Sequence, residues 1–314
     1  MTGAEAALLG VGQVSALAAA APLLNGLVRK GKARLQYRKG PPVLQSYFDL
    51  AKWWSRAEQV ANSTSFVHRL APAGVLATVV VAALLVPVFS WRTPLTPAGD
   101  LFVVVALFAL GRALLTLGGM DSGSAFGQMG SSREVAVGAL VEPVLLLSLA
   151  ALAIGPGSTR MGDIVRIADH DGAGAISLGW LLAAASFAVV LAAETGRIPV
   201  DNPDTHLELT MIHEGMLLEY SGRSLGILHF AAMLKQITLV VLMANLFVPF
   251  GLSASSPGGY VLSSALVVGK VAFIGIGLVA VESMLAKMRL FELPDLLGMA
   301  AFVALLAAAL AVLA

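Results

Sequence analysis

The fold is decided by apolar stretches such as Leu101-Phe-Val-Val-Val-Ala-Leu-Phe-Ala-Leu-Gly-Arg112-Ala-Leu-Leu-Thr-Leu-Gly118, in which Arg112 is the only charged residue. About 20 mostly apolar residues are enough for a helix to cross a bilayer. Similar stretches occupy residues 6–28, 71–90, 135–154, 178–194, 226–250, 260–283 and 294–314. We therefore predict an all-α, polytopic membrane protein, with residues 1–314 forming one transmembrane domain of about eight transmembrane helices.

The composition agrees with this class. Hydrophobic residues make up 58% of the chain and charged residues 12%, whereas soluble domains carry about 25% charged residues. A net charge of +1 gives no case for a nucleic-acid partner. The chain has no cysteine, which excludes disulfides and thiolate-ligated iron–sulfur clusters within it. The first apolar stretch has no basic residues before it and is too long for a signal peptide, so we expect a retained helix.

Lysine and arginine predict the orientation. The odd-numbered loops hold fourteen of them and the even-numbered loops hold three, Arg92, Arg160 and Arg166. Cytoplasmic loops are the positively charged ones. We therefore expect the odd-numbered loops to be cytoplasmic and both termini to lie outside the cell.

Residues 29–70 form the longest connection between two spans. Its first part is rich in basic residues, and the part after it is rich in aromatic residues. The spacing of the apolar residues from Leu44 to Trp54 predicts an amphipathic helix at the membrane interface. One interpretation is a basic segment with an anchor helix, and the other is a docking site for a soluble partner that also frames a cavity. The predicted docking residues are Arg34, Arg38, Lys39, Gly40 and Pro41. Residues 119–133 are expected to form a flexible loop of small residues, and residues 155–177 an outer loop.

An acidic segment follows the fifth span. Between Glu194 and Gly222 the chain carries six carboxylates, two histidines and Arg197. Asn202 and Pro203 suit the cap and first residue of a helix, which we predict to run to about Tyr220. Enclosed carboxylates raise one another's pKa, so such a helix could pass protons.

Charged residues also lie inside several spans. Because charges near the bilayer centre cost at least about 2.5 kcal/mol each, they persist where they meet a partner or line a wet path. They either pair and lock helices together or form a proton path joined by water. The predicted path residues are Glu142, Glu194, Asp201, Asp204, Glu208, Glu214, Glu219, Lys235, Lys270 and Glu282. No metal site is expected, because His206, Glu208 and His213 lack the spacing of metal-binding motifs.

Several motifs together resemble a known family. They are Arg34-x-Gln-x-Arg38-x-Gly-Pro41, Met120-Asp-Ser-Gly-Ser-Ala-Phe-Gly127, Ser132-Arg-Glu134, residues 196–222, and residues 282–294. This pattern resembles the membrane subunit of respiratory complex I that supports the quinone site. It is more similar to the relatives of that subunit in membrane-bound [NiFe] hydrogenases, namely formate hydrogenlyase subunit 4 and the hydrogenase-4 component.

The resemblance implies a non-catalytic, proton-handling anchor in the bacterial inner membrane. Its partners would be soluble hydrogenase-like large and small subunits, iron–sulfur subunits and antiporter-like membrane subunits, besides lipid. The iron–sulfur clusters and a [NiFe] centre would lie in those partners, and no cofactor is expected in this chain. Alternatives are the quinone-site subunit of an NADH dehydrogenase-like complex, a stand-alone ion transporter, or a purely structural anchor. Against a transporter, the sequence shows no internal repeat.

Overall fold

The structure is a computed structural model that describes residues 3–61, 63–95, 98–201, 211–252, 257–286 and 288–313. Helices make up most of this part of the chain, whose one β-type contact is an isolated bridge between Asp100 and Arg160. The elements are α1 (Gly3–Leu35), α2 (Gln45–Ser55), α3 (Phe66–Leu85), α4 (Leu101–Asp121), α5 (Ala125–Ile154), α6 (Met161–Asp171), η2 (Gly172–Ala175), α7 (Leu178–Glu194), α8 (His213–Leu217), α9 (Gly222–Phe247), α10 (Pro257–Met284), η3 (Leu290–Glu292) and α11 (Leu293–Leu313).

The described residues confirm the predicted fold class. Seven helices are long and apolar enough to cross a membrane, namely α1, α3, α4, α5, α9, α10 and α11. The apolar helix α7 has 17 residues, which is about 26 Å at 1.5 Å per residue. With α7 included, the helices match the eight predicted spans in order.

Side chains that hold the first turns explain where several helices begin. Ser65 Oγ accepts a hydrogen bond from the Val67 amide at 3.1 Å, and Asp100 Oδ1 accepts one from the Phe102 amide at 2.8 Å. Ser124 and Ser177 act in the same way before α5 and α7. These residues are preferred caps because their oxygens satisfy amides that have no partner within the helix.

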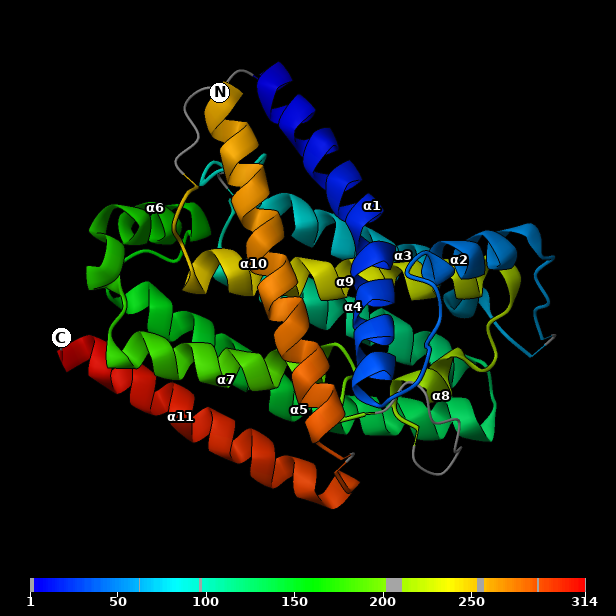
Figure 1. Cartoon of the computed structure of the whole chain (residues 1–314). Helices are drawn as coiled ribbons and strands as arrows, with labels where there is room; N and C mark the ends of the chain where they lie inside the picture. The colour runs from blue at the N-terminus through cyan, green and yellow to red at the C-terminus, as the bar shows by residue number, and fades with distance from the viewer. Residues whose placement is uncertain are drawn as a thin grey trace.

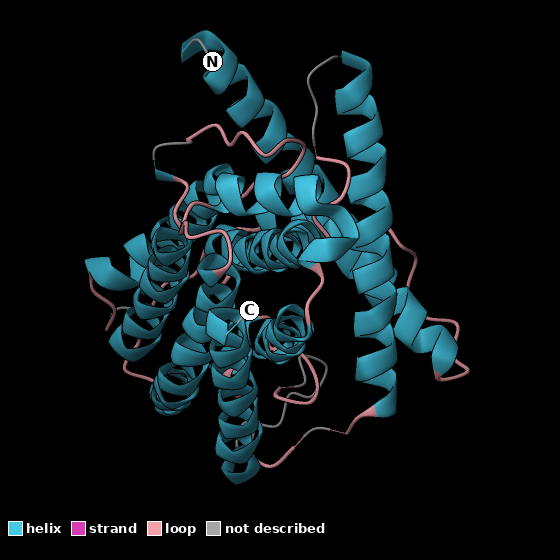
Figure 2. Cartoon of the chain, turned by 90° about the vertical axis from the view of Figure 1, so that its left-hand side faces the viewer, coloured by secondary structure: helices cyan, strands magenta, loops and turns pink. Residues whose placement is uncertain are grey.

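The helix α9 is the centre of the bundle and α10 is its edge. Of the seven long helices, α9 has the largest buried share and α10 the smallest. Figure 1 shows α9 passing through the middle, with α1 and α10 crossing it. In the view of Figure 2 many of the packed helices are seen nearly end-on, with α1 and α10 lying across them.

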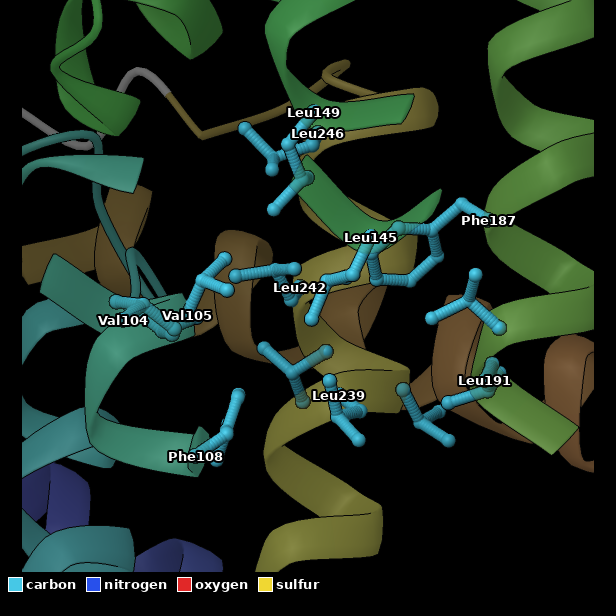
Figure 3. Close-up of a cluster of buried hydrophobic side chains, with 14 of the residues drawn as sticks. Val104, Val105, Phe108, Leu145, Leu149, Phe187, Leu191, Leu239, Leu242 and Leu246 are labelled. Atoms are coloured by element: carbon cyan, nitrogen blue, oxygen red, sulfur yellow. The ribbon is translucent and has the colours of Figure 1, made fainter. Parts of the chain in front are cut away.

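The apolar core joins α4, α5, α7 and α9. Figure 3 shows Phe108, Leu145, Phe187, Leu191 and Leu242 converging in it. Lipid tails are as apolar as leucine, so burial from water does not hold these helices together inside a membrane. Close van der Waals packing and polar contacts between helices must hold them together. The buried polar groups are therefore important for the stability of the bundle.

The end of α3 differs from the predicted span 71–90. The helix stops at Leu85, and residues 86–90 are not helical. Pro87 disfavours helical geometry at the residue before it. Two buried amides satisfy the carbonyls there: Gln13 Nε2 donates to Val86 at 2.9 Å, and Asn245 Nδ2 donates to Pro87 at 2.8 Å.

The expectation of a flexible loop over residues 119–133 was wrong. The helix α4 continues to Asp121 and α5 begins at Ala125. The glycines here allow close packing: a Cβ at Gly130 would lie 3.0 Å from the backbone oxygen of Ile212. Ser131 Oγ donates to the Thr116 carbonyl at 3.0 Å. Small residues therefore serve here to let helices approach each other.

The predicted helix from Pro203 to Tyr220 is also wrong over its described part. Residues 202–210, which include Asp204 and Glu208, lie outside the described residues. Helix α8 covers His213–Leu217 and ends before Glu219. The chain then turns, with the Tyr220 amide bonded to the Leu217 carbonyl at 3.0 Å and Gly222 at a φ of +50°.

Tyr220 fixes this turn against two other helices. Its ring stacks on His68 with centroids 4.0 Å apart, and its hydroxyl donates to the His68 carbonyl at 3.2 Å. Burial raises the pKa of the Tyr220 phenol, so the hydroxyl remains a donor. A Cβ at Gly118 would collide with this hydroxyl at 2.3 Å. These contacts hold the turn against α3 and α4.

The helix predicted in the first loop is confirmed as α2, and its position at a membrane interface stays a prediction. Ser46 and Leu50 are buried against the bundle, while Phe48 and Trp54 are largely exposed. Gly26 of α1 makes the contact possible, because a Cβ there would lie 1.9 Å from the Val43 carbonyl oxygen.

Candidate functional site

A polar cavity of about 380 Å³ opens among α1, α2, α3, α4, α5, α7, α8, α9 and α10. The non-helical segment 195–201 forms one wall, and Arg197 and Asp201 in it are buried. Irregular backbone at membrane depth is tolerated where protein encloses it or where it lines a cavity. The end of α7 at Glu194 therefore brings a loop, with its buried polar side chains, into the bundle.

Arg112 gathers three carboxylates at this cavity. Its guanidinium lies 3.3 Å from Glu134 and 2.7 Å from Glu142, and it also pairs with Glu194. On the far side of Glu194, Lys235 Nζ is 2.5 Å from the other carboxylate oxygen. We call these five residues the Arg112 cluster. Its members come from α4, α5, α7 and α9.

The sequence of α5 explains how Arg112 reaches two of these carboxylates. Glu134, Gly138 and Glu142 are four residues apart, so they lie on one face of the helix. A Cβ at Gly138 would be 2.5 Å from Arg112 Nη1. The glycine thus leaves a notch between two glutamates, and the guanidinium occupies it.

Glu282 forms the centre of a second group. Its carboxylate is 3.1 Å from Arg197 Nη1 and 3.6 Å from Lys32 Nζ, and its side chain is 2% exposed. Arg197 Nη2 also donates to Asn25 and to Gln236, each at 2.8 Å. We call these five residues the Glu282 cluster. Its members come from α1, α9, α10 and the segment after α7.

The two clusters meet along α7 and α9. Lys235 and Gln236 are consecutive on α9, and each belongs to a different cluster. Glu194 and Arg197 are similarly close at the end of α7. Gln236 is buried and lines the cavity, and its Nε2 has no hydrogen-bond partner among the described residues. A donor at this point can bind a water molecule in the cavity or a group entering it.

The loop-side part of the cavity is lined by ionisable and aromatic groups. Trp53 of α2 stacks on His229 of α9 with ring centroids 4.3 Å apart. Asp201 is buried and accepts a hydrogen bond from the His213 amide at 3.4 Å. Glu214 also lines this part. The first loop and the acidic segment therefore face the same space.

Several predicted path residues come together in this space. Glu142, Glu194 and Lys235 belong to the Arg112 cluster, Glu282 to the Glu282 cluster, and Asp201 and Glu214 to the cavity wall.

Glu142 pairs with Arg112 but does not itself line the cavity. Two further predicted path residues lie outside both the cavity lining and the clusters. Glu219 lies in the turn before α9. Lys270 is in the middle of α10, where its ammonium donates to the Phe250 carbonyl at 2.8 Å. Asp204 and Glu208 lie outside the described residues.

The predicted docking residues form an exposed turn after α1. Arg34, Arg38, Lys39 and Gly40 are exposed and Pro41 is partly so. The Arg38 amide donates to the Ala33 carbonyl at 2.7 Å, which closes the helix end. Gly40 has a φ of +66°, and a Cβ there would be 2.6 Å from that of Ala33.

The predicted site omitted more than half of the residues that form the clusters. These residues are Asn25, Lys32, Arg112, Glu134, Arg197 and Gln236. The four-residue spacing of Glu134, Gly138 and Glu142 is the one local signal that could have pointed to the Arg112 site. The described residues contain no group of three or more His, Asp or Glu side chains arranged to hold a metal ion.

Comparison with known proteins gives consistent matches over the chain. A family model described as NADH dehydrogenase matches residues 8–314. Formate hydrogenlyase subunit 4 of Escherichia coli is 35% identical over 94% of this chain and 97% of its own length. Hydrogenase-4 component C of the same organism is 36% identical over 73% of this chain and 71% of its own length.

More distant relatives extend the pattern. A subunit of the NADH-quinone oxidoreductase of Thermomicrobium roseum is 31% identical over 70% of both chains. A chain of the membrane-bound sulfane sulfur reductase, an archaeal respiratory membrane complex, has the same fold. Its TM-score is 0.86 at 20% identity, with 98% of this chain and 99% of that chain covered.

Proposed function

This chain belongs to the NADH dehydrogenase family that includes formate hydrogenlyase subunit 4, and from that premise we propose that it is the membrane anchor and proton-handling subunit of a multisubunit, complex I-like oxidoreductase. The similarity favours a membrane-bound [NiFe] hydrogenase or formate hydrogenlyase type of complex. Soluble hydrogenase-like and iron–sulfur subunits would bind on the side of α2, and antiporter-like subunits within the membrane. The iron–sulfur clusters and the [NiFe] centre would be held by those partners.

One observation carries the proton-handling role: two buried charge clusters face a single polar cavity that the first loop and the acidic segment also line. Carboxylates and water in such a space can exchange protons. The proposed path runs from Asp201 and Glu214 past the Glu282 cluster to the Arg112 cluster. Glu219, Asp204 and Glu208 would serve its entrance, and Lys270 its far half.

The experiment replaces Glu142 with Gln, which keeps the size of the side chain but cannot carry a proton. Glu142 is the most exposed member of the Arg112 cluster, so the variant should assemble. Proton uptake and subunit abundance are measured in the same membrane vesicles, together with soluble-arm activity on an artificial electron carrier. We expect normal abundance, normal artificial activity and reduced proton uptake.

The matched control is Asp171→Asn, which removes an exposed acid at the end of α6, away from the cavity. This variant should leave all three measurements unchanged. Unchanged proton uptake in Glu142→Gln vesicles with normal abundance would reject Glu142 as a path residue.

We propose a location in the bacterial inner membrane with both termini outside. The support is the fourteen-to-three distribution of lysine and arginine between odd- and even-numbered loops. Reporter fusions at Lys52 in α2 and at Ser158 before α6 should report the cytoplasmic and the external side, respectively. A report from the same side at both positions would refute this topology.

A second candidate is the quinone-site subunit of an NADH dehydrogenase-like complex. It is favoured by the similarity to the NADH-quinone oxidoreductase relative and by the volume of the cavity, since ligand pockets measure about 300–1,000 Å³. The test measures whether a short-chain quinone protects the purified complex against unfolding by heat. Protection that is lost in Trp53→Ala but kept in Trp180→Ala would favour this candidate over the first.

A further inference from the structure

The external side of the bundle, as the topology above assigns it, carries a small arginine cluster. The even-numbered loops hold three cationic residues, Arg92, Arg160 and Arg166, and the structure brings their two segments together. Arg160 forms a β-bridge with Asp100, and a Cβ at Gly162 of α6 would be 2.5 Å from the Trp91 carbonyl oxygen. The segment after α3 and the helix α6 therefore form one surface.

Two of these guanidiniums lie on one indole ring. The Cζ atom of Arg92 is 4.7 Å from the ring centroid of Trp91, and that of Arg166 is 5.5 Å from it. Such cation–π contacts position an arginine without using its hydrogen-bond donors. These contacts therefore leave the donor groups of both arginines available for a ligand.

Acidic residues on this surface neutralise the arginines incompletely. Asp163 lies 3.8 Å from Arg166, whose side chain remains 57% exposed. Asp100 accepts hydrogen bonds from the Phe102 amide and from Thr159. Arg92 has no ion pair among the described residues.

An apolar groove of about 380 Å³ begins next to Arg92. It is lined by Ala6, Ala7, Gly10 and Val11 of α1, by Leu84 of α3, and by Pro94 and Leu95. Arg92 and Pro94 are two residues apart, so their backbones are within about 7 Å of each other. The groove lies between the ends of two membrane-spanning helices.

We propose that this surface binds one anionic phospholipid, with its phosphate between Arg92 and Arg166 and an acyl chain in the α1–α3 groove. Arginine forms fork-shaped hydrogen bonds that match phosphate oxygens. Tryptophan is common at the membrane–water boundary, so Trp91 suits a position beside a lipid headgroup. A soluble anion would account for the two arginines but not for the apolar groove beside them. A ligand with an anionic head and an apolar tail accounts for both.

The test uses the full chain, purified in a neutral detergent and stripped of lipid. The midpoint of thermal unfolding is measured with added phosphatidylglycerol, phosphatidylcholine or inorganic phosphate, and retained lipid is counted by native mass spectrometry. We expect stabilisation and retention with phosphatidylglycerol. Equal stabilisation by phosphatidylcholine would overturn the role of the arginines. Equal stabilisation by inorganic phosphate would overturn the lipid and leave a free-anion site.

Three variants distinguish the two parts of the site. Replacing both Arg92 and Arg166 with Gln should weaken the apparent affinity for phosphatidylglycerol at least tenfold. Ala7→Leu places a larger side chain in the groove and should also weaken it, without touching the arginines. Arg160→Gln removes an exposed cation of the same surface that does not lie on Trp91, and should bind like the unaltered chain. Wild-type affinity in the double variant would refute the proposal.

Discussion

The buried position of Glu194 predicts that its replacement by Gln destabilises the protein far more than the same change at Glu142. The Glu194 side chain is 1% exposed and contacts both Arg112 and Lys235. Removing one partner of a buried ion pair costs about 3–5 kcal/mol, because the remaining charge stays buried without compensation. The Glu142 side chain is 34% exposed and contacts Arg112 alone within the cluster. Pairs open to water are worth up to about 1 kcal/mol.

The difference between the two variants should therefore be about 2–5 kcal/mol. Each 1 kcal/mol shifts the unfolding midpoint by about 2–4 °C in domains of 150–250 residues, so the two midpoints should differ by at least about 4 °C. Fluorescence-detected size-exclusion chromatography after heating measures both midpoints in detergent, and immunoblots measure abundance in the membrane. Equal midpoints for Glu142→Gln and Glu194→Gln would refute the assignment of Glu194 as the buried centre of the cluster.

Two further changes test the first loop. Replacing Arg34 and Arg38 with Ala should release the soluble partners in salt washes that leave the unaltered complex intact, because exposed charge contacts are screened by salt. The control is Arg69→Ala, which removes an exposed arginine on the same side. Full retention of the soluble partners by the double variant would leave only the anchor interpretation of this loop. Gly26→Ala should detach the segment before α2 and lower the unfolding midpoint, since its Cβ would overlap a carbonyl oxygen, and overpacking costs about 1–3 kcal/mol. Gly12→Ala in the same helix meets nothing within 4 Å and should be harmless, because alanine favours a helix more than glycine does. A comparable loss of stability in both variants would refute the close contact at Gly26 as its cause.

The helices could be predicted from sequence because each is specified locally. The 17 residues of α7 form an apolar run between Ser177 and Glu194, and the aromatic spacing of the first loop gives α2. The beginning of α5 was missed for a physical reason. Glycine and serine there suggested a flexible loop, whereas Ser124 caps the helix and Gly130 lets a neighbouring backbone approach.

The site was less accessible to sequence reasoning. The charges inside the spans were visible, and paired carboxylates and lysines were expected among them. Which charges meet depends on the helix packing: Arg112 and Glu194 are 82 residues apart in the chain, and Arg197 and Asn25 are 172 apart. No local spacing encodes such pairs. Lys270 had the same appearance in the sequence as Lys235, but the structure places it against the Phe250 carbonyl.

The Arg112 cluster has a consequence for how the protein is made. Arg112 belongs to the second half of α4 and precedes all of its carboxylate partners in the chain, so it reaches the membrane before they do. An isolated arginine in a helix centre opposes insertion by about 2.5–3.5 kcal/mol, so α4 should wait at the insertion machinery until α5 brings Glu134 and Glu142. The glutamate at the end of α7 and the lysine of α9 complete the set only when most of the chain has emerged. The same ion pairs that surround the cavity can thus act as an assembly checkpoint, through which a truncated chain would be recognised and degraded.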